Sequence, residues 1–337
     1  MNVFFYYHGF TDARGSLAGT SRMTWTVANF AKQQFDKVVV AGARVPDSHT
    51  CDGIFVERVQ ESELQRAVCS GFDVVVFAST PVIGRLRKPD GQIWVRSLHC
   101  WGFNSVDFGF CLRCDAITAV SKKHEDYLGM LGMPKQNMSV IQNSISEVFY
   151  PREEHRDPYS IIYAGAISDN KRIELLLTAY ECILKETPTA KLTIVGSSAM
   201  TSSCGLYEKT IGDKAAQIGA VMLPAQDQSD LATLYSRHAV VCLPSDVESF
   251  GLVLAEAQAC GCVAVAHNTG GVSVVVDDSD SGYLYSPNET RALVEAIRKA
   301  FSTPDILRPH ISAWARKAFD ASVTRTDWIR LLKRIGL

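Results

Sequence analysis

Short apolar runs rich in β-branched and aromatic residues alternate along the chain with segments of helical periodicity. Several of these runs are apolar at every position, which is typical of parallel strands covered on both faces. Strands that alternate with helices predict an α/β fold with doubly wound parallel sheets. The predicted strands are 3–7, 37–41, 74–77, 93–97, 116–120 and 139–141 in the first half, and 161–165, 192–195, 240–243, 263–267 and 283–285 in the second.

The length and one polar stretch predict two domains. A chain of 337 residues holds about two domains at roughly 150 residues each. The segment 150–158 is polar and contains two prolines, so we place the boundary there, with domains 1–150 and 151–314. A helical tail follows from about 311 to 335. Its apolar anchors, which include Trp314 and Trp328, predict that the last part, about 315–337, packs back toward the first domain.

Charge and composition exclude several function classes. The 34 basic and 36 acidic residues give a net charge of −2, which argues against nucleic acid as a partner. The apolar start has no basic leader, and no apolar run reaches the ~20 residues that span a bilayer. We therefore expect a cytoplasmic protein. The basic run 85–88 is too short for firm membrane binding and allows at most a weak peripheral contact.

Ten cysteines are distributed over the chain, and four of them lie inside apolar patterns that predict burial: Cys69, Cys182, Cys242 and Cys260. Cys111 and Cys114 have the local spacing of a zinc or redox pair. A zinc site needs two further ligands, and the sequence has no second such pair. We therefore favour structural thiols over a metal site.

The strongest signal for chemistry lies in the segment 241–257. A buried strand ends at Pro244, a short loop carries Glu248, and a helix begins near Gly251. Glycine lets a ligand approach the first-turn N–H groups, which together with the helix dipole suit a diphosphate. Glu256 lies among apolar helix residues, where a carboxylate needs a partner such as a ribose diol. A capping acid at Glu248 and a buried structural pair at Glu256 explain the spacing equally well.

Two glutamates separated by seven residues, Glu248 and Glu256, resemble the signature of retaining glycosyltransferases of the GT-B fold, especially glycosyltransferase family 4. The flanking segments 243–245, 259–263, 269–271 and 282–287 resemble that family as well. The similarity covers about 160–301 well and the first half loosely. It implies two Rossmann-like domains that face a cleft, with the nucleotide-sugar donor bound mainly by the second.

The resemblance also implies roles for residues of the second domain. Glu248 would contact the donor sugar and Lys171 would neutralise the leaving phosphate, while Glu256 would hold the ribose. The remaining donor-binding residues would be Gly196, Ser249, Phe250, Gly251 and Leu252. The family arginine that precedes the lysine by five positions is replaced by Ala166, and the neighbouring Arg172 is a weak candidate to compensate.

In the first half, Gly15 and Ser16 resemble the family's glycine-rich loop near the donor phosphates. His99 follows the predicted strand 93–97 and resembles the histidine that faces the donor sugar, although a structural histidine is an equal alternative. His8 also follows a strand, as an acceptor-side or structural residue. Asn143 begins a segment similar to the family's interdomain crossing.

The resemblance implies retaining transfer of a sugar from a nucleotide-diphosphate donor to a hydroxyl of a glycan, a glycolipid or a small molecule. No cofactor and no metal are expected, because a lysine and a helix N-terminus would meet the phosphate charge and no paired-aspartate motif ends a strand. The replacement at Ala166 favours one alternative, a catalytically silent nucleotide-sugar-binding protein. A nucleotide-sugar epimerase or phosphorylase on the same fold is another. An NAD-dependent oxidoreductase is disfavoured, since no Gly-x-Gly-x-x-Gly follows a predicted strand.

Overall fold

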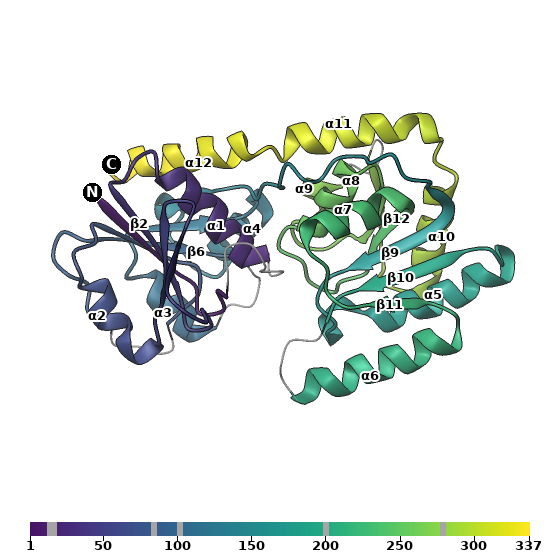
Figure 1. The fold of residues 1–337 in the computed structure, drawn as a ribbon, viewed down its shortest axis with the longest axis horizontal. Helices are drawn as coiled ribbons and strands as arrows, with labels where there is room; N and C mark the ends of the chain where they lie inside the picture. Colours follow the sequence, from purple (N-terminus) through teal and green to yellow (C-terminus); the bar gives the residue numbers. More distant parts are fainter. Residues whose placement is uncertain (12–18, 82–85, 100–103, 198–201, 277–280) are drawn as a thin grey trace. The chain divides into compact units, whose positions relative to one another are not determined.

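The structure, a computed structural model, describes residues 1–11, 19–81, 86–99, 104–197, 202–276 and 281–337 (Figure 1). It divides into two compact units, one formed by Met1–Ser144 together with Ala321–Leu337 and the other by Ile145–Asp320. The chain thus leaves the first unit at Ser144, a few residues before the polar stretch that the sequence pointed to. It contributes to that unit again with its last helix.

The first unit is built on a largely parallel sheet. Its described strands are β1 (Asn2–Tyr6), β2 (Lys37–Gly42), β3 (His49–Cys51), β4 (Ile54–Arg58), β5 (Val74–Phe77), β6 (Ile93–Ser97), β7 (Ala116–Ala119) and β8 (Met138–Val140). They are arranged in the order β3-β4-β2-β1-β5-β6-β7-β8. Neighbouring strands pair in parallel, except that β3 and β4 are antiparallel.

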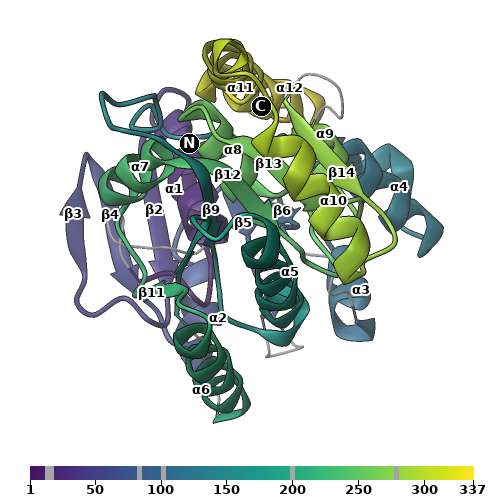
Figure 2. The same ribbon diagram turned by 90° about the vertical axis from the view of Figure 1, so that its right-hand side faces the viewer.

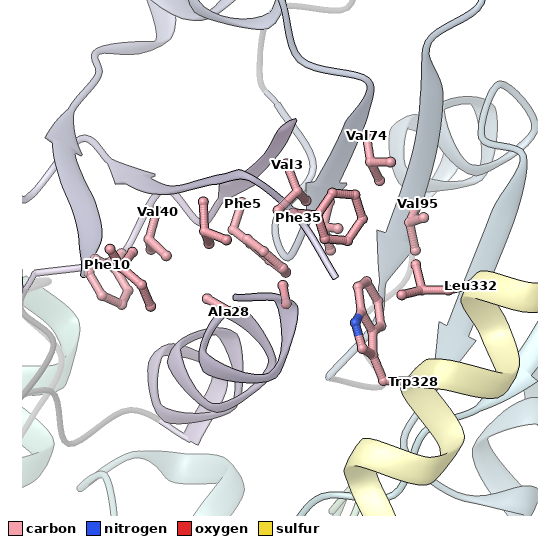
Figure 3. Packing of buried hydrophobic residues seen from close by; sticks show 14 of the residues in the cluster. Val3, Phe5, Phe10, Ala28, Phe35, Val40, Val74, Val95, Trp328 and Leu332 are labelled. Atoms are coloured by element: carbon pink, nitrogen blue, oxygen red, sulfur yellow. The ribbon is translucent and has the colours of Figure 1, made fainter. Parts of the chain in front are cut away.

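Helices cover both faces of this sheet. The described helices are α1 (Gly19–Ala31), α2 (Leu64–Val68), α3 (Ser105–Cys111), α4 (Lys122–Met130) and α12 (Ala321–Arg334), with short 3-10 turns η1 (Glu61–Glu63) and η2 (Lys135–Asn137). Residues of α1 and α12 share one buried cluster with the sheet, in which Trp328 and Leu332 of α12 lie near Val95 (Figure 3). Residues of α2 and α3 belong to the cluster on the other face.

The second unit has a parallel sheet throughout its described residues. Its strands are β9 (Asp157–Ala164), β10 (Lys191–Val195), β11 (Val221–Leu223), β12 (His238–Leu243), β13 (Val263–His267) and β14 (Gly282–Tyr285). They follow the order β11-β10-β9-β12-β13-β14. The two parallel sheets with helices on both faces confirm the predicted α/β fold.

The helices of the second unit form two groups. They are α5 (Ile173–Glu186), α6 (Ser202–Gln217), α7 (Gln228–Arg237), α8 (Leu252–Ala259), α9 (Val272–Val275), α10 (Thr290–Phe301) and α11 (Arg308–Ala318), with 3-10 turns η3 (Asp169–Lys171) and η4 (Asp305–Leu307). Helix α5 contacts α6 and α10, which lies beside it in Figure 2. Helix α8 contacts α7 and α11.

The sequence predicts one continuous helical tail. This prediction is wrong in one respect, because the helix is broken between α11 and α12. The break falls at Phe319 and Asp320, where the chain passes from one unit to the other. Phe319 is 1% exposed and packs edge-on against Phe250 and Trp314. Burial of this ring in the second unit fixes the end of α11 and explains why the helix does not continue.

None of the helices in the described part of the chain combines the length and the apolar character needed to cross a bilayer. Within the described part of the basic run 85–88, Leu86 is buried, Arg87 is exposed and Lys88 forms an ion pair with Asp115 at 2.5 Å. Arg85 lies outside the described residues. A weak peripheral membrane contact therefore stays a prediction.

Candidate active site

The carboxyl ends of the parallel strands in the second unit bring the predicted site residues together. Strand β9 ends just before Gly165, β10 just before Gly196, and β12 just before Pro244. Because β9 lies between β10 and β12, these three ends are neighbours on one edge of the sheet. Ligands of open parallel sheets bind at such an edge, where loops and helix starts converge.

Two glycines at this edge approach each other so closely that a side chain does not fit. A Cβ added to Gly196 would lie 1.9 Å from the carbonyl oxygen of Gly165. The backbone N–H of Gly165 donates to Val195, and that of Gly196 donates to Leu223. These bonds leave neither backbone free to move aside. The glycine predicted from the sequence to take part in donor binding is thus also required by the packing of the strand ends.

We expect Gly196→Ala to destabilise the second unit by at least 1–3 kcal/mol, the usual cost of overpacking, because the added methyl meets a backbone oxygen. Gly212→Ala in the middle of α6 is the matched control, since nothing lies within 4 Å of the added Cβ there. That change should instead stabilise by about 1 kcal/mol, as alanine favours a helix over glycine. Thermal or urea unfolding measures both. Equal stability of the two variants would contradict the close approach.

A lysine and a glutamate from different strand ends meet at this edge. Lys171 lies in η3 after β9, and Glu248 lies in the loop after β12. The Lys171 Nζ donates to Glu248 Oε2 at 2.7 Å. Their side chains are 21% and 15% exposed, so the pair is accessible to a ligand yet partly shielded from water. The structure therefore brings together the two residues predicted to meet the leaving phosphate and the donor sugar.

Helix α8 begins beside this pair. Its N-cap residue Gly251 has φ of 90°, in the left-handed region that glycine favours. The first turn of a helix leaves backbone N–H groups without partners inside the helix, and these groups can bind an anion. Phe250 is 1% exposed and its ring packs against Phe319, so its predicted contact with the donor stays a prediction. Ser249 and Leu252 are both half-buried.

Glu256 lies within α8 as the sequence predicted, and its side chain is buried at 1% exposure. From Leu254 to Ala259 every residue of this helix is buried. The carboxylate is therefore shielded from water. Its contact with a ribose stays a prediction.

Arg172 does not take the place of the arginine that Ala166 replaces. Its Nη1 donates to both carboxylate oxygens of Asp246, at 3.1 and 3.2 Å, and its Nε donates to Glu174 Oε1 at 2.6 Å. The carboxylates of Glu174 and Asp246 raise the pKa of the guanidinium. Asp246 was not singled out from the sequence. The one available signal was its position, two residues before Glu248 in the loop that follows β12.

In the first unit, His99 follows β6 and its Nε2 lies 3.0 Å from the Ser97 hydroxyl. Burial, with smaller contributions from Arg96 and His124, lowers the pKa of His99 to about 3. Its ring is therefore neutral near pH 7 and suited to hydrogen bonding rather than to donating a proton as an acid. His99 and Asn143 line a cavity of about 20 Å³ beneath α1 and α12, room for about one water molecule. Gly15 and Ser16 lie outside the described residues.

His8, left from the sequence as an acceptor-side or structural residue, follows β1. Its Nδ1 lies 3.4 Å from Glu61 Oε1. This pair belongs to the first unit.

The two cysteines of the Cys-x-x-Cys motif are buried free thiols. Burial raises the pKa of Cys111 to about 11 and that of Cys114 to about 12. Thiols that stay protonated at pH 7 are poor metal ligands and poor nucleophiles, which favours a structural role. Of the four cysteines predicted to be buried, Cys242 and Cys260 are buried and Cys182 is half-buried, whereas the prediction is wrong for Cys69, which is exposed at the end of the short α2. Across the described ranges no group of three or more His, Cys, Asp and Glu side chains is arranged to hold a metal ion.

Comparison with known proteins shows which family and which relatives the chain resembles. The family described as "Glycosyl transferases group 1" matches residues 146–318, about half of the chain and nearly all of the second unit. A D-inositol 3-phosphate glycosyltransferase of Saccharomonospora viridis is 33% identical over 180 residues, which cover 52% of this chain and 41% of the relative. A lipopolysaccharide 1,2-N-acetylglucosaminetransferase of Salmonella typhimurium is 28% identical over 218 residues, covering 60% and 56%. The chain thus spans about two fifths of the first of these relatives.

Solved structures match over the whole chain. The Anabaena protein HepE, solved with UDP and glucose, has a TM-score of 0.78 at 16% identity and is covered to 99%, as is this chain. A sucrose-phosphate synthase of Thermosynechococcus elongatus has a TM-score of 0.84 at 19% identity, with 99% of this chain and 98% of that one covered. At such identities the similarity establishes the GT-B fold and nothing further.

Proposed function

The chain belongs to the glycosyl transferases group 1, and from that premise we propose that it transfers a sugar from a nucleotide-diphosphate donor to a hydroxyl acceptor. The observation that carries the proposal is the pair of Lys171 and Glu248, whose charged atoms lie 2.7 Å apart beside the start of α8. A cation and a helix N-terminus suit the diphosphate, and a carboxylate suits sugar hydroxyls.

The proposed chemistry is transfer with retention of configuration at the sugar. As the bond from the sugar to the diphosphate breaks, negative charge grows on the departing phosphate oxygen. Lys171 and the first-turn N–H groups of α8 would stabilise that charge. Glu248 would orient the sugar through its hydroxyls. The acceptor hydroxyl would attack from the same face and pass its proton to the departing phosphate oxygen, so the reaction needs neither a protein nucleophile nor a metal ion.

UDP-sugars are the first donors to test, because the fold neighbour HepE was solved with UDP and with UDP-glucose. The acceptor in this proposal is a hydroxyl of a glycan, a glycolipid or a small molecule. The relatives named above, which act on an inositol phosphate and on lipopolysaccharide, support that breadth.

One observation favours a second candidate function, a protein that binds a nucleotide sugar without turning it over. Ala166 supplies no charge at the position where a family arginine is expected, and Arg172 is engaged by two carboxylates. With less positive charge at the phosphate, the transition state would be less stabilised while the donor is still bound. Turnover separates the two candidates.

The experiment that tests the proposal is a thermal shift series with UDP, GDP, ADP, dTDP and NAD, each with EDTA and again with magnesium. A ligand at 100 times its dissociation constant adds about 2.7 kcal/mol to stability. We expect one nucleoside diphosphate to raise the melting temperature in EDTA as well as in magnesium, and Glu256→Ala to remove the shift. Release of that nucleoside diphosphate from its sugar conjugates, with the sugar passing to water or to an added hydroxyl compound, then reports turnover.

A shift with NAD alone, or with none of the five ligands, would contradict donor binding. A shift that requires magnesium would contradict the metal-independent mechanism while leaving donor binding intact. Binding without turnover on any sugar conjugate would favour the silent protein.

A further inference from the structure

Arg172 occupies a backbone conformation that disfavours its side chain. Its φ and ψ are 50° and 44°, and among the described non-glycine residues only Asp52 and Arg172 have positive φ. Glycine adopts this left-handed region freely, whereas a residue with a Cβ does so at a cost in free energy. Such strain persists where the surrounding contacts hold the residue in place, and it is often found at functional sites.

The contacts that hold Arg172 join two loops of the proposed donor site. Its guanidinium binds both oxygens of Asp246 in the loop after β12, and it also binds Glu174 at the start of α5. A second tie runs between the backbones, where the Asp246 N–H donates to the Asn170 carbonyl oxygen at 2.9 Å. The loop that carries Lys171 and the loop that carries Glu248 are thus connected directly.

Asp246 is itself fixed on its other sides. The Asn288 side chain donates to Asp246 Oδ1 at 2.8 Å, and the Thr269 hydroxyl donates to the Asp246 carbonyl oxygen at 2.8 Å. The Tyr285 hydroxyl in turn donates to Asn288 at 2.9 Å. These partners come from β14 and from the segments that follow β13 and β14. Asp246 is therefore a rigid anchor for the guanidinium.

We propose that Arg172 is a positioning residue, which holds Lys171 and Glu248 at the spacing that the proposed transfer needs. Arg172 directly follows Lys171, and its anchor Asp246 precedes Glu248 by two residues. We call Arg172 together with Asp246 and Glu174 the clamp. Loss of the clamp would let the two loops move apart. This inference rests on the proposed function for its effect on turnover, and its effect on the loops themselves is independent of that function.

The same contacts argue that Arg172 does not bind the donor diphosphate. Its Nε and Nη1 are already bonded to carboxylates, and the two negative charges compensate its own. A diphosphate would have to compete with Asp246 and Glu174 for the guanidinium. Its role is therefore to orient Lys171 and Glu248. A positioning role and a direct contact with the diphosphate make opposite predictions for how tightly the Arg172 variant binds UDP.

The test compares Arg172→Gly, Asp246→Asn and a control, Asp52→Gly. Both glycine substitutions relieve the same left-handed backbone, since φ is 50° at Asp52 as well. The control lies in the turn between β3 and β4 of the first unit. Three properties are measured for each variant: amide hydrogen exchange of the loops at 168–172 and 244–250, UDP binding by calorimetry, and release of UDP from its sugar conjugates.

We expect Arg172→Gly and Asp246→Asn each to speed exchange in both loops at least tenfold and to lower kcat 10- to 100-fold, with the dissociation constant of UDP changed less than threefold. A displacement of reacting groups by about 1 Å is enough for a loss of that size. Because the two residues act as one unit, the double variant should be no worse than either single one. Asp52→Gly should match the wild type in all three measurements.

Unchanged exchange in both loops would overturn the clamp, whatever the turnover. Faster exchange with unchanged kcat would overturn its part in transfer. Weaker UDP binding in Arg172→Gly but not in Asp246→Asn would show instead that the guanidinium contacts the phosphates. A wild type that binds UDP without releasing it from any conjugate, in water or with added hydroxyl compounds as acceptors, would refute the proposed transfer, while the exchange measurement would still decide the clamp.

Discussion

Replacing Lys171 by alanine is expected to lower kcat for sugar transfer by about 10²–10³-fold, the usual loss when one group that stabilises transition-state charge is removed. The ammonium lies 2.7 Å from Glu248 at the edge where three strand ends meet. Ala166 contributes no charge and Arg172 is held by two carboxylates, so we expect Lys171 to meet most of the charge on the departing diphosphate. Steady-state kinetics with the donor found by thermal shift measures the effect.

Lys191→Ala is the matched control for that experiment. Lys191 also forms a lysine–carboxylate pair at 2.7 Å in the second unit, with Asp157. It lies at the start of β10, the end of the strand opposite to the proposed site. We expect its loss to leave kcat within twofold of the wild type. A Lys171→Ala variant that retains more than a tenth of wild-type kcat would contradict the assigned role, provided that both variants melt at the wild-type temperature.

The hydrophobic pattern was sufficient for the buried strands and failed for the exposed ones. Every strand predicted from the sequence is present, and the bounds of β5, β6 and β13 agree residue for residue. The strands missed are β3, β4 and β11. Strands β3 and β11 have three residues each and lie at sheet edges, and β4, which pairs with β3, is exposed at alternate positions. Burial on both faces produces an apolar run that is visible in sequence, whereas an edge strand needs only a few buried positions.

The sequence does contain a signal for two of the missed strands, β3 and β4. Asp52 and Gly53 separate β3 from β4, and both have positive φ, at 50° and 78°. An Asp-Gly pair between alternating residues is a strong sign of a two-residue hairpin. The strand before the turn, His49–Cys51, carries one apolar residue, and the strand after it begins with the short apolar run Ile54–Val56. The turn, taken together with that run, was therefore the evidence to use.

The residues of the candidate site were predictable from the sequence, but the contacts between their side chains were not. The spacing of Glu248 and Glu256 on one loop and helix was visible in the sequence. The contact of Lys171 with Glu248 joins residues 77 positions apart and follows from the order of the strands, with β9 beside β12. The bonds of Arg172 depend on a left-handed backbone that no local pattern indicates. Pairings of this kind are set by tertiary structure and become visible only with it.

The largest expected effect on stability is that of Trp328→Ala. Trp328 lies on α12, is 1% exposed and packs 6.1 Å, between ring centroids, from Phe5 of the central strand β1 (Figure 3). Truncation of a buried tryptophan costs about 3–5 kcal/mol. For a unit of this size that corresponds to a decrease of roughly 6–20 °C in melting temperature. Trp314→Ala on α11 should cost less, because this side chain is only half-buried and belongs to the second unit.

The Trp328→Ala variant also tests whether α12 unfolds together with the first unit. Because the buried cluster around Trp328 contains residues of the first unit, the loss should fall on the unfolding of that unit. The proposed donor site, by contrast, is built from strand ends and loops of the second. We therefore expect Trp328→Ala to lower the temperature at which the first unit unfolds and to retain UDP binding below it. A loss of UDP binding in the folded variant would mean that the first unit supplies donor contacts, as the resemblance implies for Gly15, Ser16 and His99.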